Sequence, residues 1–137
     1  MNNRASAGQR IGAFLIDLII SVPLGLIWLI PIIGTLVGGF ALLVYWLLRD
    51  LIGPSIGKRL TGLAIVTPSG SPAGAGQLVL RNLPLALPYI ILMIPLLGTF
   101  IGAGLDISIL LIELIFILAD GRRLGDKMAG TVVVVKK

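Results

Sequence analysis

The sequence predicts an all-α membrane protein in which four transmembrane helices form two hairpins, with short extended segments on the cytoplasmic side. Composition, uncharged stretches and the placement of the basic residues together support this class. Hydrophobic residues make up 57% of the 137 residues and charged residues only 12%, whereas a soluble domain carries roughly 25% charged residues. With a mean hydropathy of +1.09, the chain lacks the polar side chains that a surface in water requires.

Long uncharged stretches place the spans. Residues 18–48 exceed the roughly 20 residues that one transmembrane helix needs, and Pro31 and Gly34 mark the turn that divides them. Residues 82–105 are also uncharged; Asp106 follows, and residues 107–119 are interrupted only by Glu113. Pro95 and Gly98 divide this part in the same way. The whole chain, 1–137, is then a single integral membrane domain. Its predicted spans are about residues 11–30, 35–49, 82–98 and 103–119.

All 11 lysines and arginines lie on one side of these spans. The positive-inside rule therefore places both termini and the central loop in the cytoplasm. The two outer turns are short, and Asp106 is expected to be their only charge. Two β-branched runs on the cytoplasmic side, residues 63–66 and 131–135, favour extended segments that could pair with each other.

The chain also repeats itself. Residues 31–38 return as residues 95–102, and residues 57–66 return as residues 125–134. The repeat halves are about 1–68 and 69–137, and because both begin in the cytoplasm, the repeat is parallel. Glycines four residues apart in the first pair of segments allow close helix packing, either within each hairpin or between copies of the chain.

Two acidic residues, Asp17 and Glu113, lie inside predicted spans. Because a carboxylate facing lipid costs several kcal/mol, both should face the interior. Arg10 precedes Asp17 by two helical turns, so the two share one helix face. If the first and fourth spans are neighbours, the carboxylates could share a proton or a cation, which an ion/proton exchanger needs. The alternative is an interhelical ion pair that fixes packing.

Missing residue types exclude several function classes. Without cysteine or histidine, the chain has no disulfide, thiolate metal site or histidine-based catalysis. We find no nucleophile–base pair, phosphate loop or metal cluster, so no enzyme activity, cofactor or metal is expected. The net charge of +5 favours the bilayer and its anionic cytoplasmic lipids over nucleic acid as partner. The residues expected at the lipid headgroups are Lys58, Arg59, Arg122 and Arg123.

Four motifs carry a resemblance to the RDD family of small prokaryotic multi-pass membrane proteins. They are residues 10–17, 55–66, 80–82 and 125–134. The resemblance implies that Arg10, Asp17 and Asp126 are the arginine and two aspartates for which the family is named. It also implies the cytoplasmic (inner) membrane as location and transport of unidentified ligands, with alkali-cation/proton antiport in some members. Glu113 is not a recognised family position, so a carboxylate pair need not be a family mechanism.

Two hypotheses follow. In the first, the protein is a small, dimeric transporter that exchanges monovalent cations for protons: Asp17 binds the ion, Glu113 assists and Arg10 competes for the carboxylate. In the second, it is a noncatalytic membrane scaffold or an accessory subunit of a larger membrane complex. Arg10, Asp17 and Asp126 then tie helix ends to the cytoplasmic strands.

Overall fold

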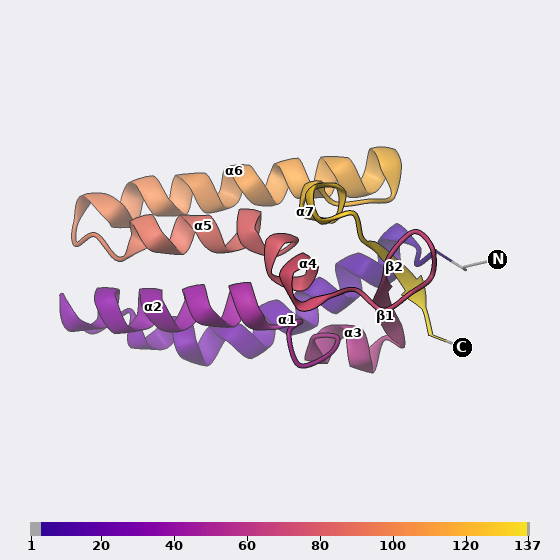
Figure 1. Ribbon diagram of the computed structural model, residues 1–137. Coiled ribbons are helices and arrows are strands. Elements are labelled where there is room, and N and C mark those ends of the chain that lie inside the picture. The colour runs from indigo at the N-terminus through magenta and orange to yellow at the C-terminus, as the bar shows by residue number, and fades with distance from the viewer. Residues whose placement is uncertain (1–3, 137) are drawn as a thin grey trace.

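The computed structural model describes residues 4–136 and is mostly helical (Figure 1). Four apolar helices, α1, α2, α5 and α6, run along the long axis of the molecule, and the shorter elements gather at one end, here named the charged end. The elements are α1 (Ala7–Ile27), α2 (Ile33–Leu48), α3 (Ile56–Leu60), β1 (Leu63–Val66), α4 (Ala75–Leu80), α5 (Leu83–Leu92), α6 (Leu97–Asp120), α7 (Leu124–Ala129) and β2 (Val132–Val135).

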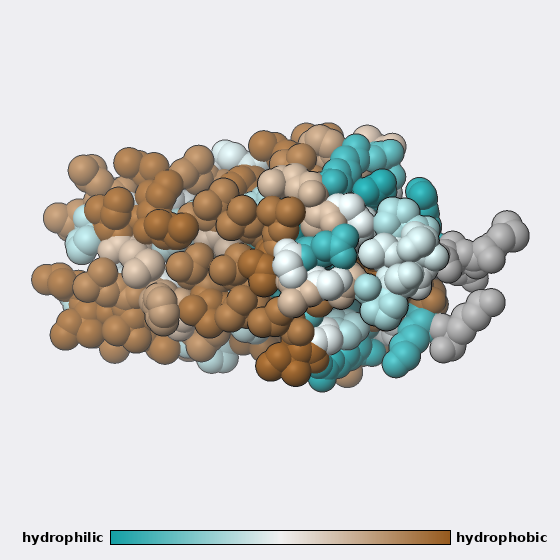
Figure 2. All heavy atoms as spheres, viewed as in Figure 1, coloured by the Kyte–Doolittle hydropathy of each residue, from teal (hydrophilic) through white to brown (hydrophobic). Residues whose placement is uncertain are grey.

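The surface of the helical part is apolar. Figure 2 shows hydrophobic residues over this part and hydrophilic residues gathered at the charged end. Ile19 on α1 is 68% exposed and Leu118 on α6 is 64% exposed. Both helices are long and apolar enough to cross a membrane. Exposed apolar faces of this extent are unfavourable in water but are satisfied by lipid, so the predicted membrane character is supported.

Aromatic residues form the core between the central helices α2 and α5. Trp46 of α2 is 2% exposed and stacks on Tyr89 of α5, with ring centroids 6.5 Å apart. Leu85 and Ala86 complete this core. Helix α1 packs on α2 and α6 packs on α5, so within the described residues α1 and α6 each have one face without a helical neighbour.

In each hairpin a short connection, residues 28–32 or residues 93–96, ends in a tight γ-turn. Ile32 adopts φ 62° while the Ile33 N–H donates to the Pro31 carbonyl at 2.7 Å. Leu96 adopts φ 65° in the corresponding turn after Pro95. Such γ-turns are strained for residues with a Cβ, so tertiary packing must hold them.

Glycines close to these turns serve contacts within each hairpin. A Cβ on Gly34 would lie 2.3 Å from the Ile27 carbonyl oxygen, and a Cβ on Gly98 would lie 2.1 Å from the Ile91 carbonyl oxygen. Nothing larger than glycine fits at this approach of two helix ends. Of the two uses predicted for these glycines, internal packing is the one that the structure shows.

The second hairpin differs from the sequence prediction. Helix α5 ends at Leu92 although the third span was expected over 82–98, and α6 begins at Leu97 although the fourth span was expected to begin at 103. The turn lies at Leu96, so Gly98 is a helix-packing residue inside α6. Asp106 consequently lies within α6, and the expectation that it belongs to an outer turn is wrong.

The two strands close the charged end. β1 and β2 pair antiparallel, with Leu63 opposite Val135 and Val66 opposite Val132, which confirms the expected extended pair. Leu63 and Val133 are buried against Ala13 of α1. The small sheet therefore covers the first turns of α1, where the charged residues converge.

Candidate functional site

Asp17 is buried in α1, and hydrogen-bond donors occupy its carboxylate. Oδ1 accepts the backbone N–H of Gly57 at 2.7 Å, and Oδ2 accepts the Ser55 hydroxyl at 2.6 Å. The Arg49 guanidinium lies 3.1 Å from Oδ2. Satisfying a buried carboxylate in this way stabilises its charge. Asp17 thereby ties α1 to the connection between α2 and α3.

Glycines let the short helices α3 and α7 approach other backbone segments. A Cβ on Gly57 would lie 1.9 Å from the Ala13 carbonyl oxygen of α1. A Cβ on Gly125 would lie 1.9 Å from the Arg81 carbonyl oxygen at the end of α4. At both places the neighbour is backbone and cannot rotate away. The glycines of the two repeated motifs therefore fix how these short helices dock.

Glu113 of α6 is 3% exposed and binds the beginning of α7. Oε2 accepts the Leu124 N–H at 2.9 Å, and Oε1 accepts the Gly125 N–H at 3.3 Å. These are amides that the helix itself cannot satisfy. Among residues 4–136, Glu113 and Asp17 share no hydrogen-bond or ion-pair partner. Both acids face the interior as predicted, but each has its own backbone target.

Arg10 binds Asp126, not Asp17. Its guanidinium forms an ion pair with Asp126 Oδ2 and also donates to the Gly121 carbonyl. The expectation that Arg10 competes for the Asp17 carboxylate is wrong. Two helical turns separate Arg10 from Asp17 by roughly 10 Å, whereas α7 brings Asp126 into direct contact.

Asp126 is the centre of a wider cationic group. Arg81 lies 2.6 Å from Oδ1, and the Thr131 hydroxyl donates to the same oxygen at 3.3 Å. Burial alone would raise the pKa of Asp126, but Arg81, Arg123 and Arg10 hold it well below its ordinary value. This carboxylate stays ionised and joins α1, α4 and α7.

Asp50 is the centre of a second group of cationic and polar side chains, which the sequence analysis did not predict. Its Oδ1 accepts Lys58 Nζ at 2.8 Å and the Ser55 N–H at 2.9 Å, and its Oδ2 accepts Asn82 Nδ2 at 3.1 Å. Arg81 lies 3.7 Å from Oδ2. Although burial opposes ionisation, Lys58 and Arg81 keep the pKa of Asp50 below its ordinary value. The available signal was the short spacing from Asp50 to Lys58, directly after an apolar span.

The predicted headgroup residues divide into two groups. Lys58 and Arg123 are both 6% exposed, so neither lies on the open surface at which headgroup contact was predicted. Their charges are balanced inside the protein by Asp50 and Asp126. Arg59 is exposed and Arg122 is half-buried, and their headgroup contact stays a prediction.

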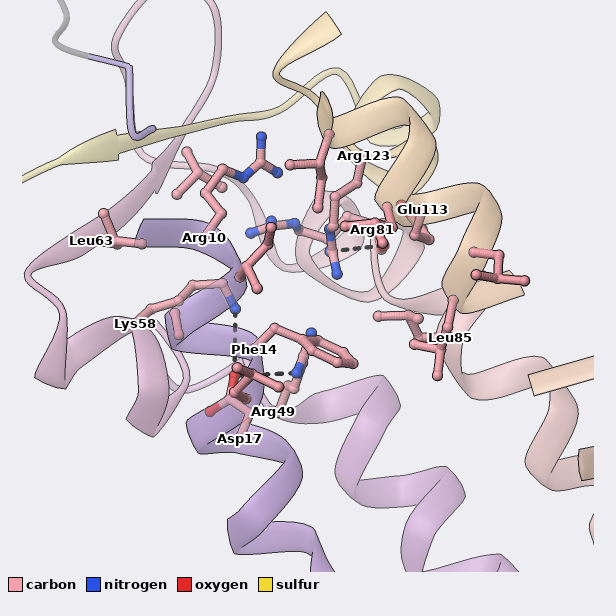
Figure 3. A pocket seen from close by; sticks show the side chains of 18 residues that line it. Arg10, Phe14, Asp17, Arg49, Lys58, Leu63, Arg81, Leu85, Glu113 and Arg123 are labelled. Atoms are coloured by element: carbon pink, nitrogen blue, oxygen red, sulfur yellow. Dashed lines mark hydrogen bonds and ion pairs between the residues drawn. The ribbon is translucent and has the colours of Figure 1, made fainter. Parts of the chain in front are cut away.

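A cavity of about 250 Å³ lies between α1 and α6 at the charged end (Figure 3). Asp17 and Glu113 both line it, from opposite sides. The cationic residues that line it are Arg10, Arg49, Lys58, Arg81 and Arg123. Apolar side chains form the remaining walls, most of them from α1 and α6 and the others from β1, α5 and β2. The cavity therefore combines an apolar side with a cationic end.

The electrostatics of this cavity favour an anion over a cation. Five cationic side chains and two carboxylates line it, and both carboxylates already bind backbone amides. Asp50 and Asp126 also pair with these cations, which leaves one cation in excess. Burial lowers the pKa of Lys58 to about 7 despite Asp50, because a buried ammonium is poorly solvated. Within residues 4–136, no three His, Cys, Asp or Glu side chains are grouped to hold a metal ion.

An apolar bundle of helices with charged groups buried at one end defines a small helical membrane protein. The chain belongs to the RDD family, whose model matches residues 4–130, and this confirms the expectation from the motifs. It is 38% identical over 132 residues to the uncharacterized protein YckC of Bacillus subtilis (strain 168), covering 90% of this chain and 80% of that protein. No solved structure matches the chain.

Proposed function

We propose that the protein crosses the cytoplasmic (inner) membrane of a prokaryote four times, as two parallel repeated hairpins with both termini in the cytoplasm. The one-sided distribution of the basic residues supports this orientation. Equivalent contacts 68 residues apart, Gly57 on Ala13 and Gly125 on Arg81, support the repeat. A single cysteine introduced at Ser69, in the central loop, should be labelled only from the cytoplasmic side. Labelling from outside would contradict this topology.

On this topology the best-supported function is that of a noncatalytic membrane scaffold or accessory subunit. The observation that carries it is the occupation of Asp17, Asp50 and Asp126 by donors from other elements. Each carboxylate binds segments that are distant in the sequence, so hydrogen bonds and ion pairs hold the charged end together. A homodimer partner or another membrane protein would then use the exposed apolar faces of α1 and α6.

Proton-coupled exchange of monovalent cations is the second candidate. One observation favours it: Asp17 and Glu113 line the same cavity, together with Lys58, whose pKa of about 7 allows a change of charge near neutral pH. A cation would have to displace Arg49 from Asp17. The surplus of cationic groups around the cavity opposes this displacement, and this places exchange second.

A reconstitution experiment separates the two candidates. Purified protein in proteoliposomes carrying a pH gradient is given Na⁺, K⁺ or Li⁺, beside folded Asp17→Asn protein. The scaffold proposal expects no cation-dependent collapse of the gradient from either protein, and a lower melting temperature for Asp17→Asn. Collapse by the unmodified protein that disappears in folded Asp17→Asn would overturn it in favour of exchange.

A further inference from the structure

The cavity between α1 and α6 has a side formed by residues that face the surrounding apolar phase. Leu15 of α1 is 50% exposed, and Leu111 and Leu114 of α6 are 55% and 37% exposed, yet all three line the cavity. Among residues 4–136, α1 packs on α2 and α3 while α6 packs on α5 and α7, so no helix of this part of the chain packs over the space between these leucines. In a membrane this side is accessible to acyl chains.

The inner end of the same cavity carries more hydrogen-bond donors than acceptors. The side chains of Arg49, Arg81 and Arg123 are 2%, 0% and 8% exposed and come from three different connections. In the described part of the chain, the Nε–H groups of Arg49 and Arg81 have no hydrogen-bond acceptor, and that of Arg123 lies no closer than 3.8 Å to its ion-pair partner Asp126. Buried donors without acceptors are costly, and guanidinium groups match the oxygens of a phosphate closely.

We propose that this cavity binds an anionic phospholipid, with its phosphate at Arg49, Arg81 and Arg123 and an acyl chain between α1 and α6. A phosphate would balance the one cation by which Arg10, Arg49, Lys58, Arg81 and Arg123 exceed the carboxylates Asp17, Asp50, Glu113 and Asp126. The apolar side explains why the ligand is a lipid and not free phosphate, since an ion in water gains nothing from exposed leucines. The proposal requires the charged end to lie at the cytoplasmic leaflet, but it does not depend on scaffold or exchange activity.

The first experiment measures lipid retention by native mass spectrometry of the full chain in a neutral detergent. Phosphatidylglycerol is compared with phosphatidylcholine, and inorganic phosphate is tested by its effect on the melting temperature. We expect saturable binding of phosphatidylglycerol, at least about tenfold weaker binding of phosphatidylcholine, and no stabilisation by phosphate alone. Phosphatidylcholine has the same phosphate, but its quaternary ammonium is repelled by the cationic side chains that line the cavity. Equal binding of the two lipids, or equal stabilisation by phosphate, would overturn the proposal.

Matched variants test the location. Leu111→Trp fills the apolar side of the cavity, whereas Ile115→Trp adds the same bulk one turn along α6, at a residue that is 62% exposed and outside the lining. Only Leu111→Trp should weaken phosphatidylglycerol binding, by about tenfold or more. Equal binding by these two variants would place the lipid elsewhere.

Charge variants test the phosphate end independently. Arg123→Gln removes a buried guanidinium, whereas Lys136→Gln removes an exposed cation from the same end of the molecule. We expect the first to reduce phosphatidylglycerol binding and the second to leave it within about twofold, because an exposed charge is screened. Equal losses would indicate general surface attraction and contradict the proposed site. If Arg123→Gln does not fold, the tryptophan pair still decides.

Discussion

The short helices α3 and α7 receive the same kind of anchor from different helices. Asp17 of α1 accepts the Gly57 amide of α3, whereas Glu113 of α6 accepts the Gly125 amide of α7. The two glycines occupy equivalent positions of the repeated motif, but the two acids do not. The requirement at this position is a carboxylate in contact with the amide, and whichever long helix passes nearest can supply it.

The two anchors differ in what else they hold. Asp17 also binds Ser55 and Arg49, so it is part of a buried ion pair, whereas Glu113 binds backbone amides alone. An ion pair broken on one side leaves a buried charge, which costs more than a lost hydrogen bond. We therefore expect substitution of the acid that anchors α3 to lower the stability more than substitution of the acid that anchors α7. The backbone contacts of the two short helices are equally close.

The largest effect on stability is expected at the two glycines, where α3 and α7 dock through the same close backbone contact. Gly57→Ala and Gly125→Ala should each destabilise the protein by about 3 kcal/mol or more, because the added Cβ would lie 1.9 Å from a backbone oxygen. Thermal unfolding in detergent measures this. Gly12→Ala is the control and should be neutral or stabilising, because in the described structure the added Cβ meets no atom within 4 Å beyond its own helix backbone. Stable, folded Gly57→Ala protein would show that the docking is not tight.

Substitutions of the two anchoring acids should then differ in their effect on stability. We expect Asp17→Asn to cost about 3 kcal/mol, because Arg49 loses its buried partner while the amide oxygen can still accept the Gly57 N–H. Glu113→Gln should cost about 1 kcal/mol, since its amide oxygen can still accept one backbone N–H. Denaturant unfolding of both variants gives the two values. Equal losses of unfolding free energy would mean that Arg49 contributes little to the anchoring of α3. That outcome would contradict the expected difference between the two anchors.

Low pH should lower the stability of the protein, because Asp50 and Asp126 become protonated. The pKa of each is lower in the folded protein than in the unfolded chain, so their stabilising contributions are present above about pH 4 and are lost as the pH falls further. Each group contributes a slope of up to about 1.4 kcal/mol per pH unit. Unfolding measured between pH 6 and pH 2 should be less pH-dependent in Asp50→Asn and in Asp126→Asn. Asp120→Asn, at an exposed ion pair, should leave the slope nearly unchanged.

The smallest effects are expected at the opposite end of the bundle. Ile32→Gly and Leu96→Gly should each raise stability by about 1 kcal/mol or less, because glycine relieves the positive φ of the two γ-turns. The gain should be larger at Ile32, where the residue is β-branched. A small rise in melting temperature checks this. Loss of stability at both positions would mean that the exposed side chains contribute more than the strain costs.

Local sequence patterns predicted most of the helices and strands but few of the contacts between distant segments. The apolar segments, the strand pair, the buried positions of Asp17 and Glu113 and the importance of Asp126 all follow from hydropathy or motifs. The partner of Arg10, the role of Asp50 and the burial of Lys58 and Arg123 do not. These depend on where α3 and α7 dock, which the glycine contacts with Ala13 and Arg81 decide.

The sequence by itself determined the membrane class, the family and the one-sided distribution of positive charge. The physical reason is that transfer into lipid depends on each segment's own composition. Only the tertiary structure decided which cation meets which carboxylate, because an ion pair such as Arg10 with Asp126 joins residues at opposite ends of the chain and forms only when α7 folds back on α1. The same folding creates a cationic cavity that no single segment contains.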